Sequence, residues 1–466
     1  MSAPTGKKMG LLGASSLVVA NMVGTGLFLL PTSLAQVGSI SIFGWIAAAI
    51  GASALGLVFA HLGMVCPKAG GPYAYARDYL GPFAAFQTNF LYWGANVIGN
   101  VAIAVSITGY LSSFIPVLHN PWMANACTAT VIWLFIWFNT RDAQLLGRFT
   151  TISTIAGILP IALVGVFGWF WFDPQVFREG WNPDHVSTVS AVQRSASIAL
   201  WAFMGVESAA VSAGVIENPT RNVPLATIIG LLVSTVIYIA CSTVLMGMLP
   251  NADLRVSGAP FAEAAGKMLG TGGELVISLA AILKAAGSLV GWILIVAQSA
   301  GAAAEDGMFP RRFSVTNRHG MPAQNLVITG VLMTLLLMTS TSPNVATQFS
   351  AITDATIILM VLPYTYSVVA MWRFNRTIEM STGRRNFFVA IGLVACLYCI
   401  AVVLGQSPLL NMKALIVMLG SAPLFALIAL QRRSPEVVEP PVPVAVVGGV
   451  GDFAAGHHGQ TTPTQL

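Results

Sequence analysis

Two apolar stretches of the sequence contain residues that could bind a small charged molecule. Residues 11–35 carry Gly24-Thr25-Gly26 at their centre, and residues 195–216 carry Gly205 and, two residues later, Glu207. Each stretch is long enough to cross a bilayer as a helix, but glycine loosens the helical backbone. In hydrocarbon, unpaired peptide groups cost several kcal/mol each, so an interruption at this depth must line a polar cavity or a ligand.

An interrupted membrane helix offers binding groups for both signs of charge. The positive dipole end of one half-helix presents N–H groups to a carboxylate, and bare carbonyls at the end of the other half suit an ammonium. We therefore assign a carboxylate to the backbone at Thr25-Gly26, with the Thr25 hydroxyl assisting, and an ammonium to carbonyls from Ala202 to Gly205. Asn21 and Gly24 belong to the same predicted site. The alternative is that the glycines only allow close packing between helices.

Two tryptophans are predicted to contact the same ligand. An indole face attracts a cation by roughly 0.5 to 2 kcal/mol and also excludes water. Trp201 adjoins the interruption near Gly205, and Trp292 lies near the middle of its apolar span. The other tryptophans considered are more typical of the aromatic belt at the membrane surface. These are Trp133, Trp137, Trp169, Trp171 and Trp181.

Polar side chains inside the third apolar span form one stripe. Tyr92, Asn96 and Asn100 are spaced four residues apart, so they lie on one face of a helix. Buried amides cost free energy unless they are paired, so this stripe needs a neighbouring helix or a ligand. Glu207, an acid at membrane depth, is predicted to act in gating, together with Tyr92. The alternative for Glu207 is a permanent hydrogen bond between helices.

Lys284 and Asp354 are charged residues within apolar spans. We expect them to form a compensating ion pair, because each charge alone would be expensive in hydrocarbon. The alternative for Lys284 is a side chain that buries its stem and reaches out to water. An unpaired Lys284 that faced the pathway would repel a dication.

Membrane helices must position all of these residues. The chain has 466 residues, of which 56% are hydrophobic and only 8% charged, too little charge for a soluble globule of this length. A window of about 20 residues predicts twelve membrane spans. They cover residues 11–35, 41–66, 82–114, 122–139, 150–172, 190–216, 224–249, 274–303, 325–341, 350–373, 386–406 and 413–431. We expect no cleaved leader, because the N-terminal residues run directly into a span of full length.

Basic residues predict the orientation of these spans. They concentrate in alternate connections, beginning with Lys7 and Lys8, so both termini are expected in the cytoplasm. The glycine-rich, aromatic segment 67–81 is interpreted as a cytoplasmic re-entrant or interfacial segment. The tail over residues 434–466 is predicted to be disordered.

Nothing in the sequence predicts a cofactor. The five cysteines fall within or at the ends of apolar spans, where small apolar fillers are the favoured interpretation, so we predict no disulfide and no metal site. A glycine-rich phosphate loop is absent from the sequence, which argues against an ATP-driven pump. No nucleic-acid partner is expected.

Six segments together carry a likeness to a known family. They are NMVGTGLFLLPTSLA at 21–35, AGGPYAYARDYLGPF at 69–83, ALWAFMGVESA at 199–209, ENPTRNVPLATI at 217–228, GSLVGWILIVAQ at 287–298 and AAAEDGMFP at 302–310. These segments resemble the basic amino acid and polyamine antiporters of the amino acid, polyamine and organocation transporter superfamily. The likeness extends to about residue 430 and is nearest to the arginine/agmatine antiporters, then to the putrescine/ornithine antiporters.

The resemblance implies an all-α integral membrane fold with twelve transmembrane helices. Two inverted five-helix repeats, over residues 11–172 and 173–373, would follow a cytoplasmic N-terminus at 1–10 and precede two further helices over 374–433. The first and sixth helices would be broken. The resemblance also implies exchange of a basic amino acid for its decarboxylated amine across a bacterial inner membrane, and a homodimer formed through the last two helices.

The resemblance also implies roles for single residues. Asn100 and Thr356 match positions that line the substrate. Trp201 would close over the substrate from the periplasmic side, Trp292 would pack below its aliphatic stem, and Tyr73 would close the cytoplasmic path. Three residues depart from the family pattern, and these are Asn96, Lys284 and Asp354.

Other functions remain open at this point. An amino acid uniporter or proton-coupled symporter would share the same fold. An intramembrane enzyme would need a nucleophile with a base, or metal ligands at helical spacing, and the buried acids and histidines form no such set. A channel would more naturally contain repeated filter segments.

Overall fold

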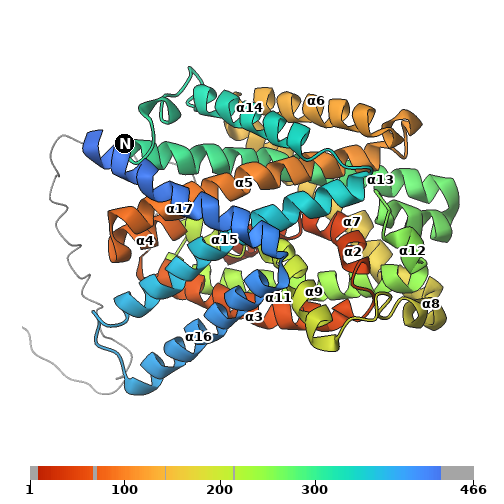
Figure 1. The fold of residues 1–466 in the computed structure, drawn as a ribbon, viewed down its shortest axis with the longest axis horizontal. Helices are drawn as coiled ribbons and strands as arrows, with labels where there is room; N and C mark the ends of the chain where they lie inside the picture. Colours follow the sequence, from red (N-terminus) through yellow and green to blue (C-terminus); the bar gives the residue numbers. More distant parts are fainter. Residues whose placement is uncertain (1–8, 67–70, 142, 214–215, 432–466) are drawn as a thin grey trace, which may run out of the picture. The chain divides into compact units, whose positions relative to one another are not determined.

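The structure is a computed structural model that describes residues 9–66, 71–141, 143–213 and 216–431. Within these ranges the secondary structure is helical apart from one isolated β-bridge between Met9 and Ile216. Figure 1 shows long helices running side by side, among them α5, α6, α13 and α14, whose pairwise contacts link the first and second halves of the chain. The predicted tail at 434–466 lies outside the described residues.

The helices cover almost all of the described chain. They are α1 (Leu11–Met22), α2 (Thr25–Ala35), α3 (Ser41–Val65), α4 (Pro72–Leu80), α5 (Pro82–Leu111), α6 (Pro121–Asn139), α7 (Ala143–Phe167), α8 (Pro174–Glu179), α9 (Thr188–Phe203), α10 (Ser208–Val211), α11 (Pro219–Met248), α12 (Asn251–Leu254), α13 (Pro260–Glu305), α14 (Ala323–Thr339), α15 (Val345–Phe374), α16 (Thr382–Gly405) and α17 (Pro408–Gln431). Short 3₁₀ helices are η1 (Pro116–His119), η2 (Gly168–Trp171) and η4 (Arg311–Phe313).

Local sequence signals explain where several helices begin. Proline occupies the first turn of α4, α5, α6, α11 and α13, where its missing N–H group would have no partner in any case. The Asn120 side chain accepts hydrogen bonds from the backbone N–H groups of Trp122 and Met123 and so caps α6. Gly81, with φ +98°, supplies the turn that separates α4 from α5.

The described helices account for every predicted membrane span. Nine helices are by themselves long and apolar enough to cross a membrane, and α1 together with Leu27–Ala35 forms a further span bent by 41°. The helix α14 is apolar but has only 17 residues. The sixth predicted span is divided between α9 and α10. The chain is therefore a multi-pass membrane protein with an all-α fold, as predicted.

Both predicted interruptions are present. The helix α1 ends at Met22 and α2 begins at Thr25, and α9 ends at Phe203 before α10 begins at Ser208. Gly205 lies in the second gap with φ +100°, a conformation that residues with a side chain rarely adopt. The helices α1 and α9 pack on α11 and α3 respectively, which hold the two breaks within the helix bundle.

Candidate functional site

The two breaks lie directly against each other. A Cβ atom placed on Gly205 would stand 3.3 Å from the backbone of Asn21, so only glycine allows this approach. The Asn21 amide donates a hydrogen bond to Ser208 Oγ at 2.9 Å and ties α1 to the start of α10. Gly205 therefore serves close packing as well as interruption, and ligand binding at this break stays a prediction.

Tyr238 of α11 connects the two breaks, and the sequence analysis did not identify it. Its buried ring stacks on Trp45, with ring centroids 5.2 Å apart. Its hydroxyl lies within hydrogen-bonding distance of the Met22 carbonyl at the end of α1 and, at 2.9 Å, of the Ala202 carbonyl near the end of α9. The hydroxyl has one hydrogen, so it donates to one of these carbonyls at a time, and the Met22 carbonyl also accepts from the N–H group of Gly24.

Carbonyls near the second break already accept intramolecular hydrogen bonds. The Ala202 carbonyl faces Tyr238, the Phe203 carbonyl accepts from the N–H group of Val206, and the Gly205 carbonyl accepts from that of Ser208. A carbonyl oxygen has two lone pairs, so an ammonium at this break would share these acceptors. Thr25 is the first residue of α2, which directs the N-terminal N–H groups of α2 toward the break, but the side chains of Thr25 and Gly26 lie outside the described structure.

A small central cavity brings together most of the predicted binding residues. It is lined by Asn21, Met22, Gly24, Asn96, Gly99, Asn100, Ile103, Trp201, Met204 and Trp292. Its volume of about 30 Å³ has room for about two water molecules. An amino acid needs several times this volume, so the structure is a closed form whose walls must move before a ligand of that size can bind.

Asn100 is the unusual wall residue. It is 1% exposed, and both its amide nitrogen and its amide oxygen lack a hydrogen-bond partner among the described residues. Leaving such groups unpaired costs roughly 1 to 3 kcal/mol each, so they indicate a function. Asn96, one turn earlier, instead donates to the Tyr92 carbonyl at 2.7 Å. Asn96 therefore uses one of its donors within α5, whereas neither polar group of Asn100 has a partner among the described residues.

Glu207 lies behind the cavity and does not line it. Its carboxylate is 1% exposed and accepts hydrogen bonds from the N–H group of Gly205 at 3.1 Å, from Tyr364 at 3.1 Å and from Tyr92 at 3.3 Å. These donors belong to the second break, α15 and α5. In this closed form Glu207 therefore joins the second break to α5 and α15, as the alternative of a hydrogen bond between helices describes, and its role in gating stays a prediction. Tyr364 was not identified from the sequence.

Trp201 closes one side of the cavity. It is 8% exposed, and its ring meets Phe349 edge-on with ring centroids 6.2 Å apart. Gly99 leaves room for it, because a Cβ atom there would stand 3.1 Å from the indole ring. Thr356 is buried beside Gly99, but its hydroxyl donates to the Ile352 carbonyl and it does not line the cavity. The tryptophans predicted for the interfacial belt are between 38% and 54% exposed.

Tyr73, predicted to close the cytoplasmic path, lies on α4, the short helix before α5. Its hydroxyl donates to Asp306 at the end of α13 at 2.5 Å, and Arg77 donates to the same carboxylate oxygen at 2.9 Å. Burial acts to lower the pKa of Arg77, but hydrogen bonds to Asp78 and Asp306 outweigh it, so the pKa lies above its ordinary value. Arg77 stays charged at physiological pH, and the contact with Asp306 is not broken by its titration.

The predicted ion pair between Lys284 and Asp354 is wrong. The side-chain nitrogen of Lys284, 1% exposed, donates to the Ala20 carbonyl at 3.1 Å and to Ser288 Oγ at 2.8 Å. It therefore does not reach water either. Asp354 faces a different cavity, which it shares with Arg194 and Gln406. The reason is that Lys284 points toward the end of α1, where helix termination leaves carbonyl acceptors.

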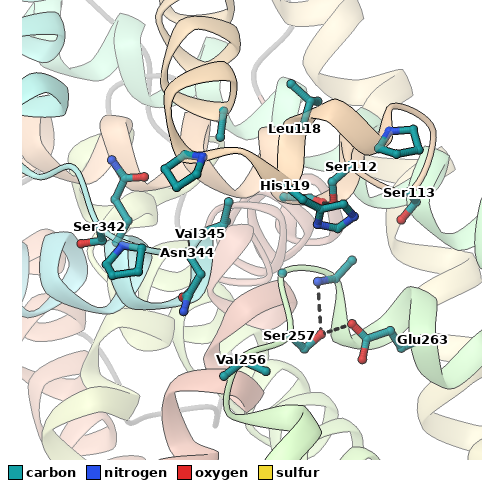
Figure 2. Close-up of a pocket in the computed structure, with 18 of the residues that line it drawn as sticks. Ser112, Ser113, Leu118, His119, Val256, Ser257, Glu263, Ser342, Asn344 and Val345 are labelled. Carbon is teal, nitrogen blue, oxygen red and sulfur yellow. Dashed lines mark hydrogen bonds between the residues drawn. The ribbon is translucent and has the colours of Figure 1, made fainter.

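A larger cavity lies away from the breaks. It has a volume of about 560 Å³ and shares no lining residue with the central cavity. Figure 2 shows it between η1, the segment around Ser257, and the start of α15, with the Ser257 hydroxyl hydrogen-bonded to Glu263 at 2.5 Å. Asp253 and Glu274 also line it. Sequence reasoning did not predict this cavity, because its residues come from connections between helices.

Comparisons with known proteins place this site in a family of transporters. The amino acid permease family model matches residues 9–427. The cadaverine/lysine antiporter of Escherichia coli (strain K12) is 38% identical over 407 residues, which cover 86% of this chain and 90% of the relative. The putrescine transporter PotE is 33% identical over 403 residues in Escherichia coli (strain K12), covering 86% of this chain and 92% of the relative. PotE of Haemophilus influenzae is 34% identical over 394 residues, which cover 84% of this chain and 90% of the relative.

These matches confirm the resemblance seen in the sequence. They extend along nearly all of the described helical region, and the relatives are transporters rather than enzymes. The broken helices and the cavity between them are features that such a protein requires. The chain belongs to the amino acid permease family, within the amino acid, polyamine and organocation transporter superfamily.

Proposed function

We propose that this protein exchanges a basic amino acid from outside the cell for the amine formed by its decarboxylation. The observation that carries the proposal is Asn100, whose buried amide has donors and an acceptor directed at the central cavity without a partner. The relatives favour lysine with cadaverine first and putrescine next, and ornithine is the amino acid whose decarboxylation gives putrescine. None of the relatives described above has arginine or agmatine in its name, so we rank that substrate pair third.

The proposed binding mode uses the two ends of the substrate separately. The amino acid carboxylate binds the N–H groups at the start of α2, and its α-ammonium binds carbonyls near the second break. The aliphatic stem lies between Trp201 and Trp292, and the distal cationic group donates to the Asn100 oxygen. An amine product keeps the stem and the distal group but lacks the carboxylate.

Alternating access would use two closures, one beside Gly99 in the middle of α5 and one on α4, which precedes α5. Trp201 with Phe349 closes one side, and Tyr73 and Arg77 with Asp306 close the other. In the orientation that the basic residues predict, the first side is periplasmic and the second cytoplasmic. Opening one closure while the other holds would carry the substrate across without a continuous pore.

The membrane setting completes the proposal. We place the chain in a bacterial inner membrane with both termini in the cytoplasm. A homodimer would use α16 and α17, whose apolar side chains, such as Leu419 at 64% exposure, face lipid or a second copy.

Exchange in proteoliposomes tests the proposal. Uptake of labelled lysine, ornithine or arginine is measured into vesicles preloaded with cadaverine, putrescine, agmatine, the same amino acid or nothing. We expect uptake only with a matched internal amine or amino acid, and most rapidly for lysine against cadaverine. Equal uptake into empty vesicles would replace exchange by uniport or proton symport, and a pH gradient then separates those two.

A further inference from the structure

A further polar cavity shares no lining residue with the central cavity. Its volume is about 350 Å³, within the range of small-molecule sites. The side chains that line it come from α2, α9, α15 and the end of α16. They are Ser33, Gln36, Arg194, Ile198, Ser350 and Asp354, with Gly405, Gln406 and Ser407.

Charges of opposite sign face this cavity. Arg194 belongs to α9 and Asp354 to α15, and the Gln406 side chain approaches the Asp354 carboxyl. The ion pairs between described residues involve Arg77 and Arg255, and none joins Arg194 to Asp354 within 4.0 Å. Gln406 is held in place by a hydrogen bond of 2.8 Å to Ser197. The cavity thus presents a guanidinium and a carboxylate that are not paired with each other.

The residues that line this cavity share two helices, α9 and α15, with the Trp201–Phe349 contact. Arg194, Ile198 and Trp201 lie on one face of α9 at positions i, i+4 and i+7. On α15, Ser350 follows Phe349, the residue against which the Trp201 ring packs. Ile198, which lines this cavity, therefore lies about one helical turn before Trp201, which lines the central cavity.

We propose that this cavity is a loading site for the zwitterionic head of an amino acid, before Trp201 opens. The Arg194 guanidinium binds the carboxylate and the Asp354 carboxylate binds the α-ammonium. This inference rests on the proposed function. An amine product has no carboxylate and brings a second positive charge toward Arg194, so the site favours the arriving amino acid and does not hold the departing amine.

The test measures exchange kinetics with substrate supplied from either face of the membrane. In Arg194→Gln and Asp354→Asn, we expect the KM for external lysine to rise about tenfold, while the KM for internal cadaverine and the maximal rate change less than about twofold. External cadaverine as a competitor gives a second readout. Its inhibition constant should fall about threefold or more in Arg194→Gln, because the repulsion is removed, and should rise in Asp354→Asn.

Matched variants separate a binding role from structural damage. Arg194→Lys keeps the charge and should recover most of the external affinity, whereas Arg178→Gln and Glu274→Gln, which lie outside this cavity, should leave all constants unchanged. Unchanged external KM values in both test variants would overturn the loading site alone. A cadaverine inhibition constant that rises together with the lysine KM in Arg194→Gln would also overturn it. Wild-type vesicles without any exchange would instead overturn the proposed function, and the loading site with it.

Discussion

Lys284 donates a hydrogen bond from its side-chain nitrogen to the carbonyl oxygen of Ala20, 3.1 Å away in the last turn of α1. The donor is buried on α13 and the acceptor lies just before the break. A nearby contact brings Ser288 of the same helix within 3.3 Å of the position that a Cβ atom on Gly24 would take. The middle of α13 is therefore packed along the break in the first span.

Replacing Lys284 should impair exchange more than folding. A buried amino group with two uncharged acceptors is expensive in apolar surroundings, so Lys284→Met removes a cost as well as a hydrogen bond. We expect a melting temperature within about 3 °C of wild type and an exchange rate lowered about tenfold or more. Lys267→Met is the control, because Lys267 caps the Met248 carbonyl away from the breaks. Full exchange activity in Lys284→Met would contradict this prediction.

Asn100→Leu should separate stability from binding. The substitution replaces two unpaired buried polar atoms with apolar ones of similar size, so thermal stability should stay level or rise by about 1 kcal/mol. Substrate binding should fall at least tenfold, about 1.4 kcal/mol or more. Asn96→Leu is the comparison, since it loses the hydrogen bond to Tyr92 and should lower stability. Stability would be followed by thermal melting and binding by labelled lysine. A large loss of stability in Asn100→Leu would mean that the Asn100 amide stabilises the fold, and would contradict this prediction.

Tyr238→Phe tests the connection between the two breaks. The variant keeps the ring stacked on Trp45 but leaves the Met22 and Ala202 carbonyls without their hydroxyl donor. We expect a loss of about 1 to 2 kcal/mol in stability, accompanied by slower exchange. Tyr398→Phe is the control. Its hydroxyl donates to the Ala196 carbonyl, which lies within α9 and before the break, so the variant should lose stability but keep its exchange rate. Equal exchange rates in the two variants would argue against a role for Tyr238 at the breaks.

Tyr73→Phe should shift the transporter toward the form open to the cytoplasm. It removes the hydroxyl that donates to Asp306 and so weakens the closure on that side. A population shift of this kind lowers the KM for internal cadaverine and raises the KM for external lysine, each by roughly threefold. Kinetics measured from both faces check this. The exposed Arg311, changed to Gln, serves as the control on the same side. Changes of the same sign at both faces would indicate general damage instead.

The sequence by itself determined the spans, the two breaks and most of the cavity wall. Long apolar segments have no stable alternative to helices in a membrane, and glycine at their centres marks where the helices stop. A polar side chain within such a helix, such as Asn100, is conspicuous because hydrocarbon cannot satisfy it. Helical spacing also placed Asn96 and Asn100 on one face, and both line the cavity.

Only the tertiary structure decided which residues meet. Periodicity specifies the face of a helix but not the neighbour that covers it, so Tyr238, Tyr364 and Asp306 became site residues only when distant helices packed together. The same reason explains the error at Lys284 and Asp354. A charge at membrane depth requires a partner. Because α13 packs against the end of α1, Lys284 donates to the Ala20 carbonyl. Asp354 instead lines a separate cavity together with Arg194.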